Sequence, residues 1–155
     1  MDQHRPARQR RHRPARRNPH RHLKGASPIA DNLSNTAENR CLDFIMGNSA
    51  TAPTTPLKVA LVTANGSDTS AGTEVAGGSY ARKNMTVAAA TNGATSNSAD
   101  LTWTGMPAAT VVGVEVWDNA GAPVRLWYGA LGASRTVGSG DELKIVAGAL
   151  SFALA

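Results

Sequence analysis

The sequence predicts an all-β protein, a two-layer antiparallel β-sandwich of about seven or eight strands with one short N-terminal helix. Three observations favour this class: period-2 alternation of apolar residues, glycine-containing breaks roughly every ten residues, and few aromatics among abundant small residues. The 155 residues have room for one ordinary domain and an extension. We divide the chain into an arm and linker over 1–30, a helix over 31–48 and the sandwich over 55–155.

The segment from Thr110 to Leu131 predicts the central β-hairpin of the sandwich. Its aliphatic side chains alternate along two strands: Val112, Val114 and Val116, then Val124, Leu126 and Tyr128. The residues between the strands, DNAGA at 118–122, tolerate positive φ and reverse the chain. Trp117 and Trp127 then lie opposite the aliphatic rows. Either the sheet is covered on both sides, or these two tryptophans form an exposed face that contacts a partner.

A short amphipathic helix is expected before the first strand. Asn35 is the expected N-cap, Glu38 completes a capping box, and Gly47 ends the helix. One face carries apolar residues that should pack on the sandwich or on a neighbour: Ala37, Cys41, Leu42 and Ile45. Cys41 is the single cysteine, so there is no intrachain disulfide, and we interpret it as a small buried hydrophobe.

Apolar alternation predicts further strands at 57–63, 79–88, 101–104, 135–137, 141–146 and 149–154. Leu150, Phe152 and Leu154 should alternate into the core in the last of these. The segment 65–78 is polar and glycine-rich and is expected to be an exposed loop. Turns are expected at Asn92-Gly93 and at 138–140.

The basic residues are concentrated in an N-terminal arm. Residues 1–25 hold nine basic side chains and one acidic, a net +8, and residues 26–155 hold seven basic and ten acidic, a net −3. The arm contains three prolines and lacks apolar periodicity, so it should be disordered unless a partner orders it. Its partner-contacting residues would be the arginines Arg8, Arg10, Arg11, Arg13, Arg16, Arg17 and Arg21. They suit phosphates or an acidic protein surface, and the alternative is a solvated tail or residues added by an upstream start codon.

The residues for common catalytic and metal chemistry are missing from the body of the chain. All four histidines lie in the arm, so no Ser-His-Asp or Cys-His site is expected in the body, and no metal or cofactor is expected. Four carboxylates are interpreted as turn residues and solvated strand ends, not as an acid/base pair for a sugar: Glu115, Asp118, Asp141 and Glu142. No apolar run is long enough to cross a bilayer, so no membrane contact is expected.

The body resembles small virion proteins of tailed phages of the actinobacteriophage type, which are often labelled tail fibre or minor tail proteins. The resemblance covers about residues 33–155, and its most specific segments are Tyr80-Ala81-Arg82, the strand from Val114 to Asp118, Trp127 to Leu131, and Gly140-Asp141 to Leu154. The basic arm departs from the pattern. The resemblance implies a non-enzymatic building block with a β-sandwich, and such sandwiches also serve as head-decoration proteins.

We therefore expect a structural virion protein that passes through the host cytoplasm during assembly. The preferred interpretation is a capsid decoration or minor capsid protein on the outer shell, bound to the major capsid protein and to copies of itself as a trimer, with other virion proteins as further partners. The alternative in the same class is a tail fibre or minor tail component that contacts the host surface. A nucleic-acid-binding protein that uses the basic arm is the alternative from another class.

Overall fold

The computed structural model describes residues 29–30, 33–48 and 51–154. It has one helix, α1 (Asn35–Ile45), and strands β1 (Ile29–Ala30), β2 (Leu57–Ala64), β3 (Thr73–Glu74), β4 (Lys83–Met85), β5 (Ala94–Ser96), β6 (Leu101–Trp103), β7 (Ala109–Trp117), β8 (Arg125–Val137), β9 (Leu143–Ile145) and β10 (Ser151–Ala153). Several strands are only two or three residues long, so the described residues hold more strands than the seven or eight expected. The all-β, sandwich-like class with one short helix is confirmed.

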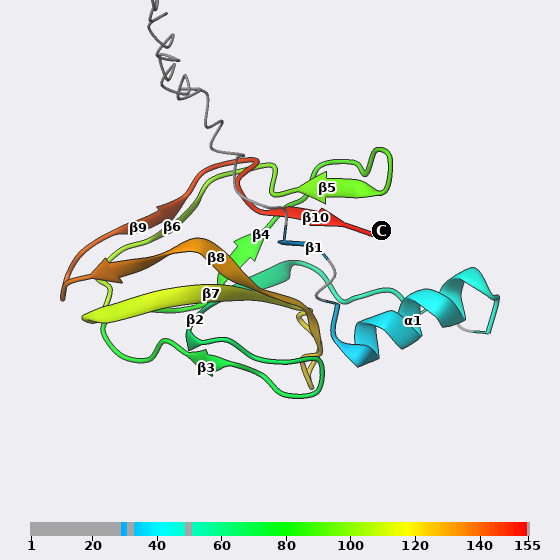
Figure 1. Cartoon of the computed structure of the whole chain (residues 1–155), viewed down its shortest axis with the longest axis horizontal. Coiled ribbons are helices and arrows are strands. Elements are labelled where there is room, and N and C mark those ends of the chain that lie inside the picture. The colour runs from blue at the N-terminus through cyan, green and yellow to red at the C-terminus, as the bar shows by residue number, and fades with distance from the viewer. Residues whose placement is uncertain (1–28, 31–32, 49–50, 155) are drawn as a thin grey trace, which may run out of the picture.

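The main sheet is antiparallel and runs in the order β3-β2-β7-β8, with β4 also paired to β2. The β2–β7 ladder is regular from Lys58 opposite Trp117 to Val62 opposite Gly113. The predicted hairpin corresponds to β7 and β8, and β8 is longer than predicted because it continues to Val137. Strands β3, β2, β7 and β8 form the lower layer in Figure 1, and β4 lies above β2 in that view.

The second layer consists of two smaller sheets, β6-β9 and β1-β10-β5, which lie above the main sheet (Figure 1). Their inward side chains meet those of the main sheet in one core cluster, whose members are Val59, Leu61, Val75, Met85, Leu101, Trp103, Met106, Val111, Val114, Val116, Val137, Leu143, Ile145, Leu150 and Phe152. Burying apolar side chains from both layers is what holds such a sandwich together. Leu150 and Phe152 enter the core as predicted, but Leu154 is 55% exposed at the chain end, so that prediction is wrong.

The alternation along β7 departs from the predicted pattern at an irregularity in the ladder. Val111 pairs with Arg135 and Gly113 with Ala130, so Val112 stands opposite the four β8 residues 131–134. A bulge of this kind changes which residues face the core. Val111 joins Val114 and Val116 in the core, and Val112 is only half-buried. The predicted row of Val112, Val114 and Val116 is therefore wrong at its first member.

Helix α1 has a cap at each end, and its N-cap lies one residue before the predicted N-cap. Ser34, not Asn35, is the N-cap, and its side chain accepts a hydrogen bond from the Ala37 amide. The Ser34 hydroxyl also donates to the Arg125 carbonyl, and this bond fixes the start of the helix to β8. Gly47 has a φ of +77°, as expected for a glycine that ends a helix.

The short strands depart from the prediction in several places. Strands β1, β3 and β5 are additional, because they lie in segments predicted as the arm and linker, the exposed loop 65–78 and the region of the Asn92-Gly93 turn. The predicted strand at 79–88 is reduced to β4. Tyr80 and Arg82 lie before β4 and bind Glu74 through their side chains. The turns are confirmed: Asn92 and Gly93 both have positive φ, and the Asp141 amide donates to the Gly138 carbonyl.

Candidate interaction surfaces

A buried ion pair lies on the face of the main sheet that points away from the core. Arg125 Nη1 donates to Glu115 Oε1 at 2.8 Å, and the two residues are 7% and 2% exposed. The guanidinium also donates to the carbonyls of Ser67 and Ser70, and the Gly72 amide donates to Glu115 Oε1 at 2.7 Å. Buried charges are retained only when paired and hydrogen-bonded, and here every partner beyond the pair belongs to loop 65–72. The ion pair therefore fastens this loop over the sheet.

Loop 65–72 lies directly on the sheet because glycine occupies the contact. A Cβ at Gly113 would collide with Asn65 Oδ1 and would lie 2.6 Å from the Gly129 carbonyl oxygen. The absence of a side chain in the middle of β7 thus gives the loop room to approach. On the outside of the loop, Asp68 accepts hydrogen bonds from the Tyr128 hydroxyl and the Asn35 amide, which connect it to β8 and α1.

Replacing Gly113 with valine should lower the free energy of unfolding by about 1–3 kcal/mol. Valine suits a strand better than glycine does, so a loss would come from the collision with Asn65 and Gly129 alone. Gly121→Val is the matched control, since an added Cβ there meets nothing within 4 Å, and it should change stability by less than about 0.5 kcal/mol. Equal urea midpoints for the two variants would contradict direct packing of the loop on β7.

Asp118 closes the hairpin between β7 and β8 and is 2% exposed. Its carboxylate accepts hydrogen bonds from the Val124 amide at 2.7 Å, from the Ala120 amide, and from Arg40 Nη1 at 3.3 Å. Burial disfavours the charged form, but these donors outweigh it and hold the pKa of Asp118 below its ordinary value. The Arg40 contact also ties α1 to the hairpin turn.

The lowered pKa of Asp118 predicts a loss of stability in acid. The charged carboxylate is favoured in the folded state, so its contribution is present above the ordinary value of about 4 and is lost as the pH falls through the lower folded pKa. Asp118→Asn should therefore be less stable than the wild type at pH 7, and the difference should shrink at pH values of about 2–3. Urea unfolding at both pH values, with Glu142→Gln as the exposed control, measures this; a difference that does not change with pH would contradict it.

A third polar cluster explains the Tyr80-Ala81-Arg82 segment. Arg82 binds the Glu74 carboxylate through Nη2 at 2.7 Å and Nε at 3.0 Å, and the Tyr80 hydroxyl donates to Glu74 Oε1 at 2.9 Å. The same hydroxyl accepts a hydrogen bond from the Leu61 amide. Burial, with the neighbouring Glu74 carboxylate, raises the pKa of Tyr80 far above its ordinary value. The cluster is an internal clamp between β2, β3 and the segment before β4.

The two tryptophans predicted to contact a partner lie on opposite faces of the main sheet. Trp127 stands opposite Val116 and packs on the core, with its ring 5.4 Å from that of Phe152. Trp117 stands opposite Arg125, and the Arg82 guanidinium lies 4.4 Å from the centre of its ring. Both are half-buried, so an exposed face made of the two rings is wrong. Their contact with a partner stays a prediction.

The four carboxylates that were interpreted as turn residues and solvated strand ends differ in burial. Asp118 lies in the hairpin turn as interpreted, but it is buried and paired with Arg40. Glu115 is buried and paired with Arg125, so the interpretation as a turn residue or solvated strand end is wrong for it. The interpretation holds for the exposed Asp141, which accepts from the Gly138 amide in the turn, and for the exposed Glu142.

Among the described residues no group of His, Cys, Asp and Glu could hold a metal ion, and no helix is long and apolar enough to cross a membrane. The seven arginines of the arm lie outside the described residues.

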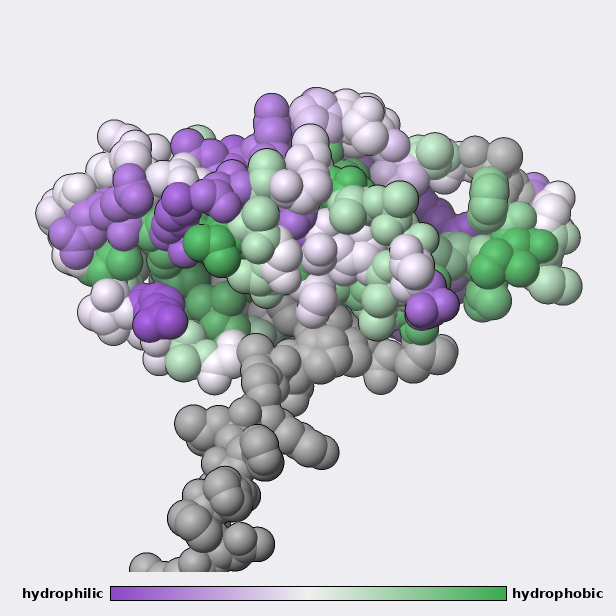
Figure 2. All heavy atoms as spheres, turned by 90° about the horizontal axis from the view of Figure 1, so that it is seen from above, coloured by the Kyte–Doolittle hydropathy of each residue, from purple (hydrophilic) through white to green (hydrophobic). Residues whose placement is uncertain are grey.

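Exposed apolar side chains gather at the far end of α1. Leu42, Phe44, Ile45 and Met46 are 61%, 67%, 72% and 72% exposed, and only Ala37 of the helix is buried. We call these four residues the helix-end patch. Figure 2 shows hydrophobic residues at the right-hand end, where α1 lies in Figure 1. The predicted apolar face thus packs on the sandwich only at its start, and Cys41 is half-buried rather than buried.

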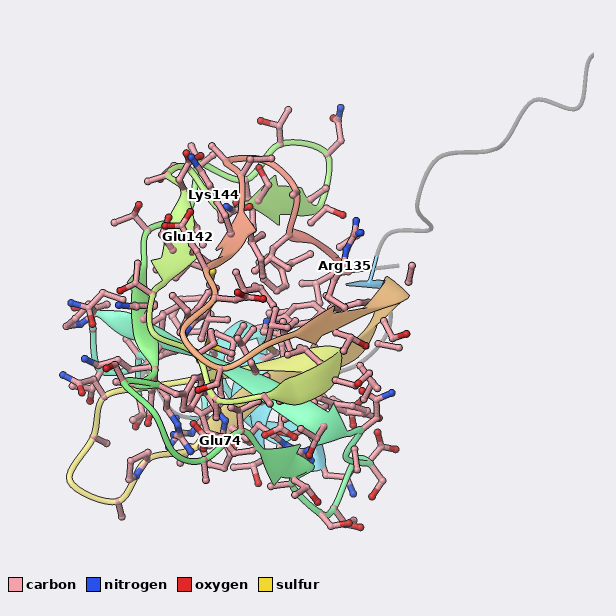
Figure 3. The ribbon with its side chains drawn as sticks, turned by 90° about the vertical axis from the view of Figure 1, so that its left-hand side faces the viewer. Glu74, Arg135, Glu142 and Lys144 are labelled. Carbon is pink, nitrogen blue, oxygen red and sulfur yellow. The ribbon has the colours of Figure 1, made fainter. Side chains whose placement is uncertain are left out.

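A groove opens between the edges of the two layers, at the opposite end of the molecule from α1 (Figure 1). It has a volume of about 640 Å³ and is lined by Leu131, Gly132, Ala133, Arg135, Thr136, Val137, Glu142, Leu143, Lys144, Ile145, Val146, Ala149 and Leu150. We call it the β8–β9 groove. Figure 3 places Arg135 on one side and Glu142 and Lys144 on the other.

Comparison with known proteins identifies the family of this sandwich. Residues 32–153 match the model of the family described as podophage GP4 fiber I protein gp80. The chain belongs to this family. No curated protein matches the sequence. Membership of the fiber I protein family confirms the resemblance to tailed-phage virion proteins and makes the chain a structural component of a phage virion. It supports the fibre alternative better than the capsid decoration that we preferred.

Proposed function

We propose that this chain is a fibre subunit of a phage virion and acts as a non-enzymatic structural module. The observation that carries the proposal is that the carboxylates of this fibre-family chain are engaged in holding the fold together. Glu115, Asp118 and Glu74 each bind an arginine and neighbouring backbone or hydroxyl groups, so they fix loops and the helix in place. A carboxylate held in this way is a structural support and is not free to act on a substrate.

The family match favours the fibre over the alternative of a decoration protein on the outer shell. The two proposals differ in stoichiometry, because decoration repeats over the capsid lattice and fibres occupy a few symmetry-related positions. Quantitative mass spectrometry of purified particles, with the major capsid protein as the internal standard, measures the copy number. The fibre proposal expects about tens of copies per particle or fewer, as in closed symmetric assemblies. Hundreds of copies would overturn it in favour of decoration.

For the arm, we propose contact with an acidic protein surface of the virion. Arginine pairs with carboxylates in bidentate geometry, and its density in residues 1–25 suits such a surface. Deletion of residues 1–25 should remove the protein from the particle but leave the sandwich folded. If the deleted chain instead loses only a salt-sensitive affinity for DNA and still joins the particle, the arm is a nucleic-acid-binding segment. The trimer and the contact with the major capsid protein remain proposals of the same kind.

A further inference from the structure

We propose that copies of this chain associate head to tail, with the helix-end patch of one copy seated in the β8–β9 groove of the next. The inference rests on the proposed fibre function, since a fibre requires contacts between subunits, and it names the two surfaces that make them. Both surfaces are apolar, both lack a partner among the described residues, and they lie at opposite ends of the molecule (Figure 1). Two different complementary surfaces on one chain give a heterologous contact, which repeats along a line or closes into a ring.

The helix-end patch is too apolar for a solvated helix terminus. Leu42, Ile45 and Met46 lie on the outer side of α1 at helical spacing, and Phe44 lies beside the shallow pocket between α1 and residues 51–53. The earlier turns of α1 are mostly polar, so the exposed apolar side chains are concentrated at its C-terminal end. Neighbouring exposed apolar side chains of this kind mark an interaction site on a soluble domain.

The groove offers a matching apolar floor and room for side chains. Leu131 and Leu150 line it from the two layers, and the small residues Gly132, Ala133 and Ala149 leave its mouth open. Figure 2 shows hydrophobic residues between hydrophilic ones at the end opposite α1. A groove of about 640 Å³ with apolar walls suits side chains such as leucine and isoleucine better than a polar ligand.

The charges around the β8–β9 groove favour the end of α1 as its occupant over a second groove or a basic segment. The last turn of α1 has no basic residue, contains Asp43, and presents the negative end of the helix dipole. On the groove side, Arg135 is exposed and makes no ion pair among the described residues, whereas Lys144 is paired with Asp100 and Glu142 lies on the far rim. Arg135 is therefore placed to meet the end of a helix seated in the groove.

Two variants block the two surfaces separately in the full-length chain. Leu42→Lys with Ile45→Lys places two charges in the patch, and lysine in a last helical turn suits the helix dipole, so α1 should be retained. Ala133→Trp with Ala149→Trp fills the groove from its exposed mouth. The matched controls are Val87→Lys, an exposed apolar residue outside both surfaces, and Ser134→Trp, an exposed neighbour of Ala133 that does not line the groove. Circular dichroism checks that each variant folds.

Sedimentation velocity measures how strongly the wild type and each variant associate. The wild type and both controls should form oligomers that grow with concentration, and each blocked variant alone should associate at least about tenfold more weakly. An equimolar mixture of the two blocked variants should form a heterodimer and stop there, because one supplies the helix and the other the groove. A wild type that is monomeric at about 1 mM, or a mixture without heterodimers, would overturn the head-to-tail contact. Dimers of the groove-blocked variant alone would instead indicate helix-to-helix pairing. These results are independent of where the protein lies in the particle, so they separate this inference from the proposed function.

Discussion

Replacing Glu115 with leucine should lower the free energy of unfolding by about 3–5 kcal/mol, because it leaves Arg125 buried without its counter-charge. Arg125 is 7% exposed, and its remaining hydrogen-bond partners are the carbonyls of Ser67 and Ser70, with the Tyr128 ring 4.7 Å from the guanidinium. Those carbonyls satisfy donors but do not neutralise the charge. Urea unfolding followed by circular dichroism measures the loss. The variant should also free loop 65–72, which faster hydrogen exchange of the Gly72 amide would show.

A double variant at Glu115 and Arg125 distinguishes the cost of an unpaired buried charge from the cost of lost packing. Adding Arg125→Met to Glu115→Leu removes the unpaired charge and should restore part of the lost stability, since replacing both partners of a buried pair costs less than removing one. Glu142→Leu is the control for the substitution itself, because Glu142 is exposed, and it should stay within about 0.5 kcal/mol of the wild type. Additive losses in the double variant would show that the pair does not hold the loop by charge.

Replacing Trp103 with alanine should cost about 3–5 kcal/mol, the usual range for a large aromatic side chain in a packed core. Trp103 lies on β6 in the second layer and is 1% exposed. Its indole Nε1 donates to the Ala81 carbonyl at 3.0 Å, so the substitution leaves a cavity between the layers and removes a partner from that carbonyl.

Trp117→Ala is the matched control for Trp103→Ala. Trp117 is half-buried outside the core cluster, and its Nε1 has no hydrogen-bond partner among the described residues. Its loss should therefore be clearly smaller, and it should come mainly from the contact with Arg82. Equal losses for the two tryptophans, measured by denaturant unfolding, would mean that the two-layer core is not where the structure places it.

The fold class was predictable because short apolar strands separated by glycine-rich turns allow few alternatives. Leu57 to Thr63, Leu101 to Trp103 and the central hairpin each show the period of two that a half-buried strand requires. Two features escaped this reasoning. The bulge opposite Val112 depends on the partner strand, and the reduction of 79–88 to β4 depends on how many residues pair with β2, so neither is encoded by local alternation.

The candidate surfaces were harder to predict, for a reason that Glu115 illustrates. A charged residue in a strand normally indicates a solvated face, and its partner Arg125 is recognisable only when the hairpin is folded and loop 65–72 covers it. The absence of a side chain at Gly113 was the available signal, because a glycine inside a strand often marks a close approach of backbone. The exposed end of α1 was missed because Leu42 and Ile45 matched a helix that packs along its whole length.

We propose that this sandwich is a structural unit of a fibre. A cryo-EM reconstruction of the intact particle tests it most directly, because the outline of two packed layers with a projecting helix is recognisable at side-chain resolution. We expect the sandwich in density that projects from the particle, with α1 against a neighbouring subunit. Density for the sandwich repeated across the capsid lattice, with none in any projecting fibre, would contradict the claim.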